Sequence, residues 1–269
     1  MLWLASLLGM FAIGASAFAS GDDLTPVSED ADDLSSEDFD TGDLIDDLTA
    51  DSFEGGLILP GTDSADVLGG ADGNDQINGY DGNDTVAGMY GDDVLHGGEG
   101  NDAVAEGEGA DELHGEYGVD TLAGGDGDDA MFGHGDCDTL AGGEGNDELH
   151  GGDGNDTLAG GAGDDALHGG LCEDVLEGGE GEDTLFAGWG DDALTGQDDT
   201  DPNSVDYLNG GGGDDTIIAG QSDIVTTGDG ADTIILGQWL EDAATEIMDY
   251  DAADDSLLLV WDLKEDPDP

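Results

Sequence analysis

Residues 142–168 read GGEGNDELH GGDGNDTLA GGAGDDALH, three nine-residue lines that almost superimpose. The same pattern runs from Gly61 to Thr195 in fifteen consecutive units. Its sixth position is Asp and its eighth is apolar in all fifteen, while its first is Gly in thirteen and its fourth in twelve. Only a repeated structural unit keeps four columns in register over this length, so the sequence predicts a repeat architecture.

The glycines divide each unit into a turn and a strand. Glycine at positions one, two and four favours backbone conformations that side chains forbid, so we expect positions one to six to form a turn and the last three a strand. One unit cannot bury its single apolar residue. Two units, or 18 residues, would make one coil, and coils would stack with parallel strands about 4.8 Å apart. The predicted fold is all-β: a parallel β-roll, which is a right-handed β-solenoid with two units per coil, and a C-terminal β cap.

Position nine alternates between two kinds of residue, which supports a coil of two units. His96, His114, Phe132, His150, His168 and Phe186 occupy one set of units, and alanines 87, 105, 123, 141 and 159 the other. The histidine column is predicted to be an outward polar ladder, with pKa values raised by the surrounding carboxylates. Binding of a transition metal is the alternative. His134 is expected in a turn, outside this column.

The segments around the repeats differ in composition. Residues 1–20 are uncharged and apolar with small residues near their end, which predicts a signal peptide or N-terminal anchor. Residues 21–60 hold 14 acidic side chains and no period, which predicts an acidic disordered linker. We expect the repeat domain over 61–237, with a five-residue insertion near 196–200, and a C-terminal cap and tail over 238–269.

Composition excludes several classes of function. The chain has 70 acidic residues and one basic residue, giving a formal charge of -69. Such a surface repels nucleic acid and anionic membranes and attracts cations. The sequence contains no H-E-x-x-H zinc motif and no G-x-S-x-G nucleophile motif, and its single basic residue cannot support phosphate chemistry, so we predict no enzyme activity. A cell-surface or matrix partner remains open.

The aspartate columns call for a cation. Stacking places position-six carboxylates about one strand spacing apart along each edge, which costs roughly 1 kcal/mol per pair even in water. Calcium suits the oxygen-rich turns, whereas magnesium favours strict octahedral geometry with retained water and zinc favours Cys or His. The predicted calcium ligands are Asp66, Asp75, Asp84, Asp93, Asp102, Asp111, Asp120, Asp129, Asp138, Asp147, Asp156, Asp165, Asp174, Asp183, Asp192, Asp206, Asp215 and Asp232. The candidate backbone carbonyl ligands are those of Gly98, Gly100, Gly143, Gly145, Gly152, Gly154, Gly161 and Gly163.

Units such as GGEGNDELH (142–150) and GGDGNDTLA (151–159) resemble the RTX, or haemolysin-type, calcium-binding nonapeptide repeat, G-G-x-G-x-D-x-U-x with U apolar. The resemblance extends over roughly residues 61–237. It implies a parallel β-roll with calcium between turns n and n+2, held by position-six aspartates and turn carbonyls. It also implies a bacterial protein exported unfolded through a type I system and folded by extracellular calcium. We therefore expect an extracellular protein, secreted or anchored to the cell surface through residues 1–20.

Some features depart from this family pattern. Family members usually carry a C-terminal export signal, so the apolar N-terminal segment leaves the export route open. Ser64, Asp136 and Cys172 replace the position-four glycine, and we expect weaker sites there and an interruption of the ion columns at the insertion. Calcium-dependent adhesion or a matrix role is the alternative function. An ice-binding module is disfavoured, because position three is mostly acidic or small and threonine at position seven is intermittent.

Overall fold

The computed structural model describes residues 56–196, 204–237 and 244–260. Within these ranges it contains β-strands and no helix. The predicted signal or anchor (1–20), most of the linker (21–60) and most of the insertion segment lie outside the described residues, as do 238–243 and 261–269 of the predicted cap and tail. In the described parts of the chain no helix is long and apolar enough to cross a membrane.

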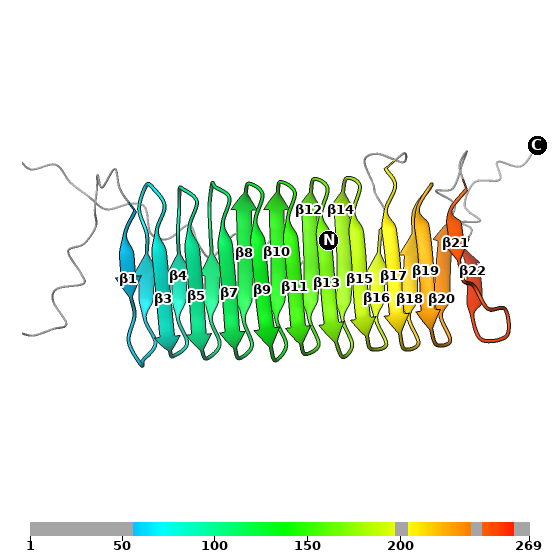
Figure 1. Ribbon diagram of the computed structural model, residues 1–269, viewed down its shortest axis with the longest axis horizontal. Helices are drawn as coiled ribbons and strands as arrows, with labels where there is room; N and C mark the ends of the chain where they lie inside the picture. Colours follow the sequence, from blue (N-terminus) through cyan, green and yellow to red (C-terminus); the bar gives the residue numbers. More distant parts are fainter. Residues whose placement is uncertain (1–55, 197–203, 238–243, 261–269) are drawn as a thin grey trace, which may run out of the picture. The chain divides into compact units, whose positions relative to one another are not determined.

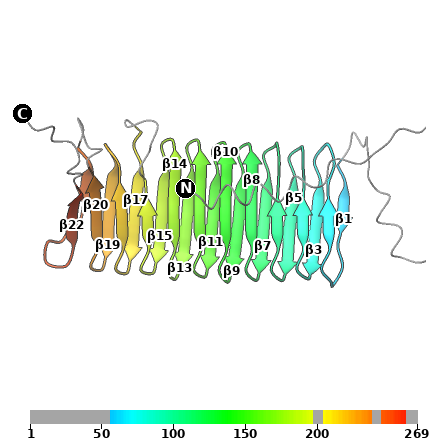
Figure 2. The same cartoon turned by 180° about the vertical axis from the view of Figure 1, so that it is seen from behind.

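The strands form two parallel sheets of 11 strands each, and the chain alternates between them (Figures 1 and 2). The first sheet contains β1 (Ile58–Pro60), β3 (Gln76–Asp81), β5 (Val94–Glu99), β7 (Glu112–Tyr117), β9 (Ala130–Gly135), β11 (Glu148–Asp153), β13 (Ala166–Leu171), β15 (Thr184–Trp189), β17 (Tyr207–Gly212), β19 (Ile224–Asp229) and β21 (Glu246–Met248). The second contains β2 (Val67–Gly69), β4 (Thr85–Ala87), β6 (Ala103–Ala105), β8 (Thr121–Asp126), β10 (Thr139–Glu144), β12 (Thr157–Ala162), β14 (Val175–Glu180), β16 (Ala193–Thr195), β18 (Thr216–Ala219), β20 (Thr233–Gly237) and β22 (Ser256–Val260).

The strand register confirms a coil of two nonapeptides. Leu149 pairs with Leu167 and His150 with His168, each partner lying two full units further along the chain, and the second sheet repeats the same offset. Each coil therefore contributes one strand to each sheet. The all-strand parallel β-solenoid predicted from the repeats is the observed fold.

The division of each unit into turn and strand was predicted wrongly. In the middle of the roll a strand covers six residues rather than three: β11 ends at Asp153 and β12 begins at Thr157. The reason lies in the position-two glycines, which stay paired with their equivalents in adjacent coils, as Gly143 does with Gly161. Gly143 has a φ of 127°, a left-handed value that bends the strand without breaking its stacking.

The repeat pattern is offset near residue 200, and the stacking absorbs the offset. Between Leu185 and its partner Leu208 the chain holds five residues more than a regular coil. The next coil, between Leu208 and its partner Val225, is one residue short. Both changes fall outside the strands, so the position-eight column stays in register.

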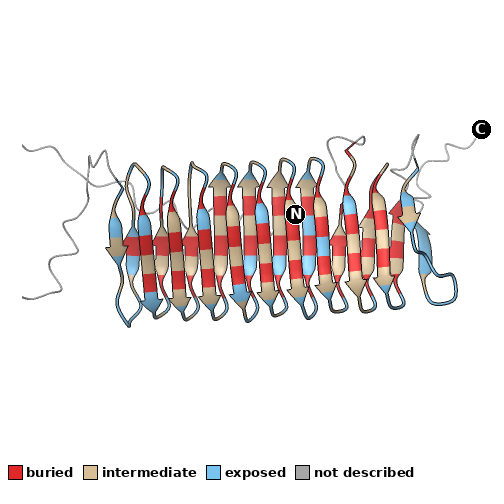
Figure 3. Cartoon of the chain, viewed as in Figure 1, coloured by how far each residue is buried: buried red, intermediate tan, exposed pale blue. Residues whose placement is uncertain are grey.

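The core lies between the two sheets and consists mainly of the position-eight apolar side chains, joined by Ala187, Ala219 and Leu236. Figure 3 shows the buried residues recurring from strand to strand. From Ile77 to Ile234 every position-eight side chain is at most 1% exposed. Full burial of one such side chain contributes roughly 1.5–3 kcal/mol. At the far end β22 pairs only with β20, and its residues Ser256–Val260 are exposed.

Candidate calcium sites

The position-six aspartates form two columns, one along each edge of the roll. Each aspartate lies directly before a strand: Asp147 precedes β11 of the first sheet, and Asp156 precedes β12 of the second. Asp66 is partly exposed, whereas the other seventeen predicted ligands are at most 4% exposed. So many buried carboxylates require stabilising partners.

One carboxylate oxygen of each aspartate is occupied by the backbone. The Asp147 amide donates to Asp165 Oδ1 at 2.8 Å, and the Asp156 amide donates to Asp174 Oδ1 at 2.8 Å. The same bond recurs along both columns, with lengths from 2.6 to 3.2 Å. A position-six aspartate therefore links its coil to the preceding one, before any cation is considered.

The columns continue across the insertion. The Asp183 amide donates to Asp206 Oδ1, and the Asp192 amide to Asp215 Oδ1, both at 2.9 Å. The extra residues leave the stacked strands aligned, so the aspartate ladder itself is continuous here, and an interruption of the ion columns stays a prediction.

The second oxygen, Oδ2, is buried without a hydrogen-bond partner in most of the columns. The aspartates with such an Oδ2 include Asp84, Asp93, Asp102, Asp120, Asp129, Asp138, Asp147, Asp156, Asp165, Asp174, Asp192, Asp215 and Asp232. A buried carboxylate oxygen without a donor is costly, so a repeated set of them indicates a ligand that supplies positive charge.

The glycine at position one leaves room for such a ligand. A Cβ added to Gly142 would overlap Asp147 Oδ2 and would lie 2.6 Å from the carbonyl oxygen of Gly160, one coil further on. Oxygens from two successive coils thus converge on the space that a side chain would fill, which we call the position-one cradle. An oxygen-lined gap of this kind suits a hard divalent cation.

The predicted carbonyl ligands lie elsewhere: those at position four (Gly100, Gly145, Gly154 and Gly163) are in the turns, and those at position two (Gly98, Gly143, Gly152 and Gly161) are in strands. All eight have φ values from 116° to 149°, in the left-handed region that favours glycine. The carbonyls of Gly143 and Gly145 face the equivalent glycines of the next coil, where added Cβ atoms would overlap them. The position-one carbonyls beside Oδ2 were missed, since repeat spacing alone does not show which way a carbonyl points.

Burial shifts the acid–base behaviour of the columns. Desolvation raises the pKa of Asp129, Asp138 and Asp165 to about 7, and the charges of neighbouring column members add to the rise. Amide donation from the preceding coil opposes this shift without cancelling it. Neighbouring aspartates therefore cannot all hold a negative charge at neutral pH without a compensating cation.

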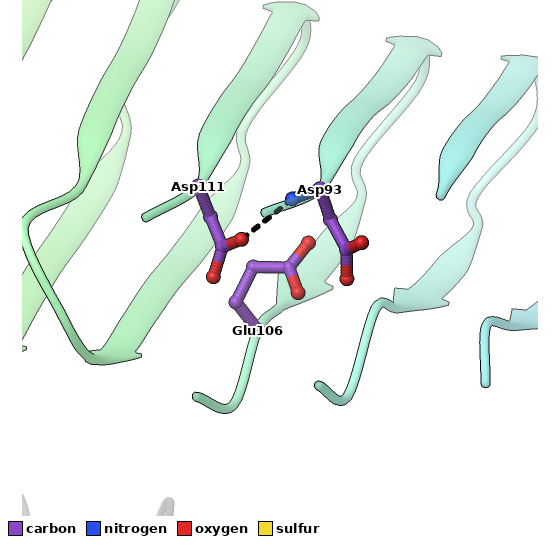
Figure 4. A group of neighbouring side chains, drawn as sticks. All are labelled: Asp93, Glu106 and Asp111. Carbon is purple, nitrogen blue, oxygen red and sulfur yellow. Dashed lines mark hydrogen bonds between the residues drawn. The ribbon is translucent and has the colours of Figure 1, made fainter. Parts of the chain in front are cut away.

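Glu106 is an exception to the glycine rule at position one. Its carboxylate lies between Asp93 and Asp111, and one oxygen from each of the three residues lies within 4.8 Å of the others (Figure 4). Burial, followed by the charges of Asp111 and Asp93, raises the pKa of Glu106 to about 10. The group therefore holds its proton at neutral pH unless a cation replaces it. Sequence reasoning missed this residue, although it is the one charged side chain at position one among the fifteen units.

Two further aspartates extend the columns beyond the predicted ligand set. The Asp206 amide donates to Asp223 Oδ1 and the Asp232 amide to Asp255 Oδ1, each at 3.2 Å. Asp223 shows in the sequence as a one-residue slip of the repeat. Asp255 follows no periodic signal, because the apolar pattern changes after residue 237.

The units without a position-four glycine keep the same backbone conformation. Asp136 and Cys172 have φ values of 75° and 79°, in the left-handed region that side chains disfavour. Ser64 lies at the exposed start of the roll. Weaker cation binding at these turns stays a prediction.

The position-nine residues of the first sheet form a stacked column on its outer face. Consecutive rings from His96 to Phe186 have centroids 4.6–5.2 Å apart and planes within 11° of parallel. The predicted rise in pKa is wrong for His168 of this column: desolvation, then the neighbouring His150, lowers its pKa. The pKa of His134, outside the column, is lowered by desolvation and by His114. His134 also lies in β9 rather than in a turn, because its strand extends through position two.

The sequence matches the family model of the RTX calcium-binding nonapeptide repeat, which represents four copies of the repeat. The matches cover residues 60–89, 69–104, 107–140, 141–171, 168–201, 203–234 and 220–238, which together make up more than half of the chain. A search of curated proteins found no match. Matching repeats and regularly stacked aspartates together identify a protein that binds Ca²⁺ at multiple sites. The chain belongs to the family of RTX calcium-binding nonapeptide-repeat proteins.

Proposed function

We propose that calcium binds in the position-one cradles between successive coils and that this binding drives the roll to fold. In each cradle the cation contacts Oδ2 of a position-six aspartate and the position-one carbonyl of the next coil, as for Asp147 and Gly160. The observation that carries the proposal is the buried Oδ2 without a donor, repeated along both edges. The predicted ligand set, extended by Asp223, supplies the carboxylates.

Charge explains why folding depends on the cation. The chain has a formal charge of -69, and stacking brings the column carboxylates into burial beside one another. Without calcium, repulsion and desolvation oppose stacking, and a protein's net stability is only about 5–15 kcal/mol. A cation between each pair of coils converts repulsion into attraction, so binding and folding occur together.

A calcium titration followed by circular dichroism tests the folding role. We expect little β structure in chelator and a cooperative rise at calcium concentrations of roughly 0.1–1 mM, the range of extracellular calcium modules. Magnesium at the same concentrations should be much less effective, because it sheds its water reluctantly. Full β structure in excess chelator at neutral pH would refute calcium-driven folding.

A substitution inside the column tests the ligand assignment. Asp147→Asn keeps the Oδ1 acceptor for the Asp129 amide but turns an amide group toward the cradle. Asp153→Asn removes the same charge from an exposed position in the next unit. We expect Asp147→Asn to lose bound calcium, as counted by calorimetry, and Asp153→Asn to keep it. Equal stoichiometry in both variants would contradict the assignment of Asp147.

We also place the protein outside the cell. Support comes from the expected calcium range, which is that of extracellular modules, and from the export that is usual for RTX proteins. Fractionation of cells producing the full chain, with detection by an antibody against the repeats, tests this location. Recovery of the chain in the cytoplasm alone would contradict it.

A further inference from the structure

Three of the five histidines gather on the outer face of the first sheet, away from both aspartate columns. His96, His114 and His134 belong to the successive strands β5, β7 and β9. The His114 ring contacts the residue at position two of the next coil, which is His134, and His114 Nδ1 lies 3.0 Å from His134 Nε2. Their ring centroids are 5.3 Å apart and their planes 20° from parallel, so two ring nitrogens from successive coils face each other.

A carboxylate fixes the state of His114. Its other ring nitrogen, Nε2, lies 2.9 Å from Oε1 of Glu112, two residues earlier on the same strand. A carboxylate accepts a hydrogen bond and so places the proton on Nε2, which leaves a lone pair on Nδ1 facing His134. This arrangement of carboxylate, histidine and open nitrogen is the one that surrounds metal-binding histidines in proteins.

His134 holds its place against backbone preference. Its φ is 75°, in the left-handed region. The residue paired with it in the next coil is Gly152, and glycine adopts this conformation readily. Glu116, paired with His134 across β7 and β9, has a φ of 82°. Side chains are disfavoured in this left-handed region, where glycine is the usual residue. Two neighbouring side chains of metal-binding type thus occupy positions that favour glycine.

We propose that His114 Nδ1 and His134 Nε2 bind a divalent transition metal ion of the copper, nickel or zinc class. The 3.0 Å separation suits two neighbouring positions around one such ion, once the rings turn to aim their lone pairs at it and the His134 proton moves to Nδ1. Glu116, paired with His134 across β7 and β9, is a further candidate donor; its Oε1 lies 3.2 Å from His96 Nδ1. Water completes the coordination, since no third side-chain donor within the described ranges is already in place here.

The site is chemically separate from the calcium columns. Imidazole nitrogen suits copper, nickel and zinc, whereas calcium takes oxygen ligands. The parallel rings elsewhere in the column do not offer such a site. His150 resembles His114, with Nε2 2.8 Å from Glu148 Oε1, but the next coil presents Gly170 instead of a second histidine.

Copper binding to the full, calcium-saturated chain tests the proposal. Paramagnetic resonance counts the nitrogens bound to Cu²⁺, a readout that acidic side chains cannot produce, and competition with a chromophoric chelator gives the affinity. We expect one Cu²⁺ with two histidine nitrogens. His134→Gly should weaken binding at least about tenfold, and Glu112→Gln by about 10–100-fold, the usual cost of removing a supporting carboxylate.

Two variants separate metal binding from folding. His134→Gly and Tyr80→Gly both place glycine at a position-two residue with a left-handed φ, 75° and 74°, so both should fold at least as well as the parent in calcium. His150→Ala removes a histidine–glutamate pair without a second nitrogen. Tyr80→Gly and His150→Ala should keep the two-nitrogen signal. The proposal is overturned if His134→Gly binds copper as the parent does, or if His150→Ala loses as much affinity as His134→Gly.

Discussion

The two oxygens of each column aspartate have different roles. Oδ1 accepts an amide from the preceding coil, as Asp165 does from Asp147, while Oδ2 faces the position-one cradle. The repeat identifies the position-six aspartate as a ligand. It cannot show which carboxylate oxygen accepts the amide and which faces the cradle, because that depends on the neighbouring coil. The glycine at position one is read from sequence as a turn former, yet its φ is outside the left-handed region in units such as 142–150. Its role is to leave space.

Filling one cradle should remove a calcium. Gly142→Ala places a methyl group between Asp147 Oδ2 and the Gly160 carbonyl, so we expect lower calcium stoichiometry and a higher calcium concentration at the folding midpoint. Gly69→Ala is the matched control, since a Cβ there meets no atom within 4 Å. Calorimetric titration measures both variants. If they bind calcium equally, the position-one cradle is not the site.

Glu106 should couple calcium binding to proton release. Its pKa of about 10 means that the carboxyl is protonated at pH 8, and a cation between Asp93 and Asp111 would displace that proton. We expect calcium titration at pH 8 to release about one more proton from the parent than from Glu106→Gln, which keeps the shape without the titratable group. A weakly buffered indicator dye reads the difference. Equal proton release from the two proteins would show that calcium does not displace the Glu106 proton.

At the scale of the strand, most strands contribute one buried apolar side chain and rely on their neighbours for the rest. A single nonapeptide buries nothing alone, which is why the period, rather than local propensity, predicted the strands. The length of the strands was not predictable in the same way. Strand β11 extends to Asp153 because the position-two glycine continues the ladder, and that pairing exists only between coils.

Removing one core side chain should weaken the calcium-loaded roll. Leu158 in β12 is fully buried, and its replacement by alanine should cost about 2–5 kcal/mol in the free energy of unfolding. Val175→Ala in the neighbouring strand β14 changes a side chain that is 48% exposed and should cost about 0.5 kcal/mol or less. Denaturant unfolding at saturating calcium measures both. A loss for Leu158→Ala no larger than that for Val175→Ala would mean that the thin core does not hold the coils together.

At the scale of the molecule, acidity and folding oppose each other unless a cation is bound. Two edges of buried carboxylates run the length of a chain with a formal charge of -69. The raised pKa values of the column aspartates mean that the folded roll binds protons more tightly than the unfolded chain does. Protons and calcium therefore compete for the same carboxylates.

Acid should partly replace calcium. For Asp129 the folded pKa of about 7 lies above its ordinary value of 3.8, so the folded state is penalised above pH 7 and gains stability as the pH falls from about 7 toward 4. In chelator, we expect more β structure at pH 5.5 than at pH 8, as measured by circular dichroism. With calcium present, apparent affinity should fall over the same interval. A loss of β structure on acidification in chelator would contradict this account.

The sequence by itself determined the fold class, the coil of two nonapeptides, the buried position-eight residues and the identity of the column aspartates. These follow from periodicity, since every unit obeys the same local chemistry. The tertiary structure alone decided which oxygens are left for a cation, which carbonyls meet them, and that Asp255 joins a column. It also brought His134 to His114 and Glu106 between two aspartates. Each of these depends on contacts between coils, and a contact that occurs once leaves no period in the sequence.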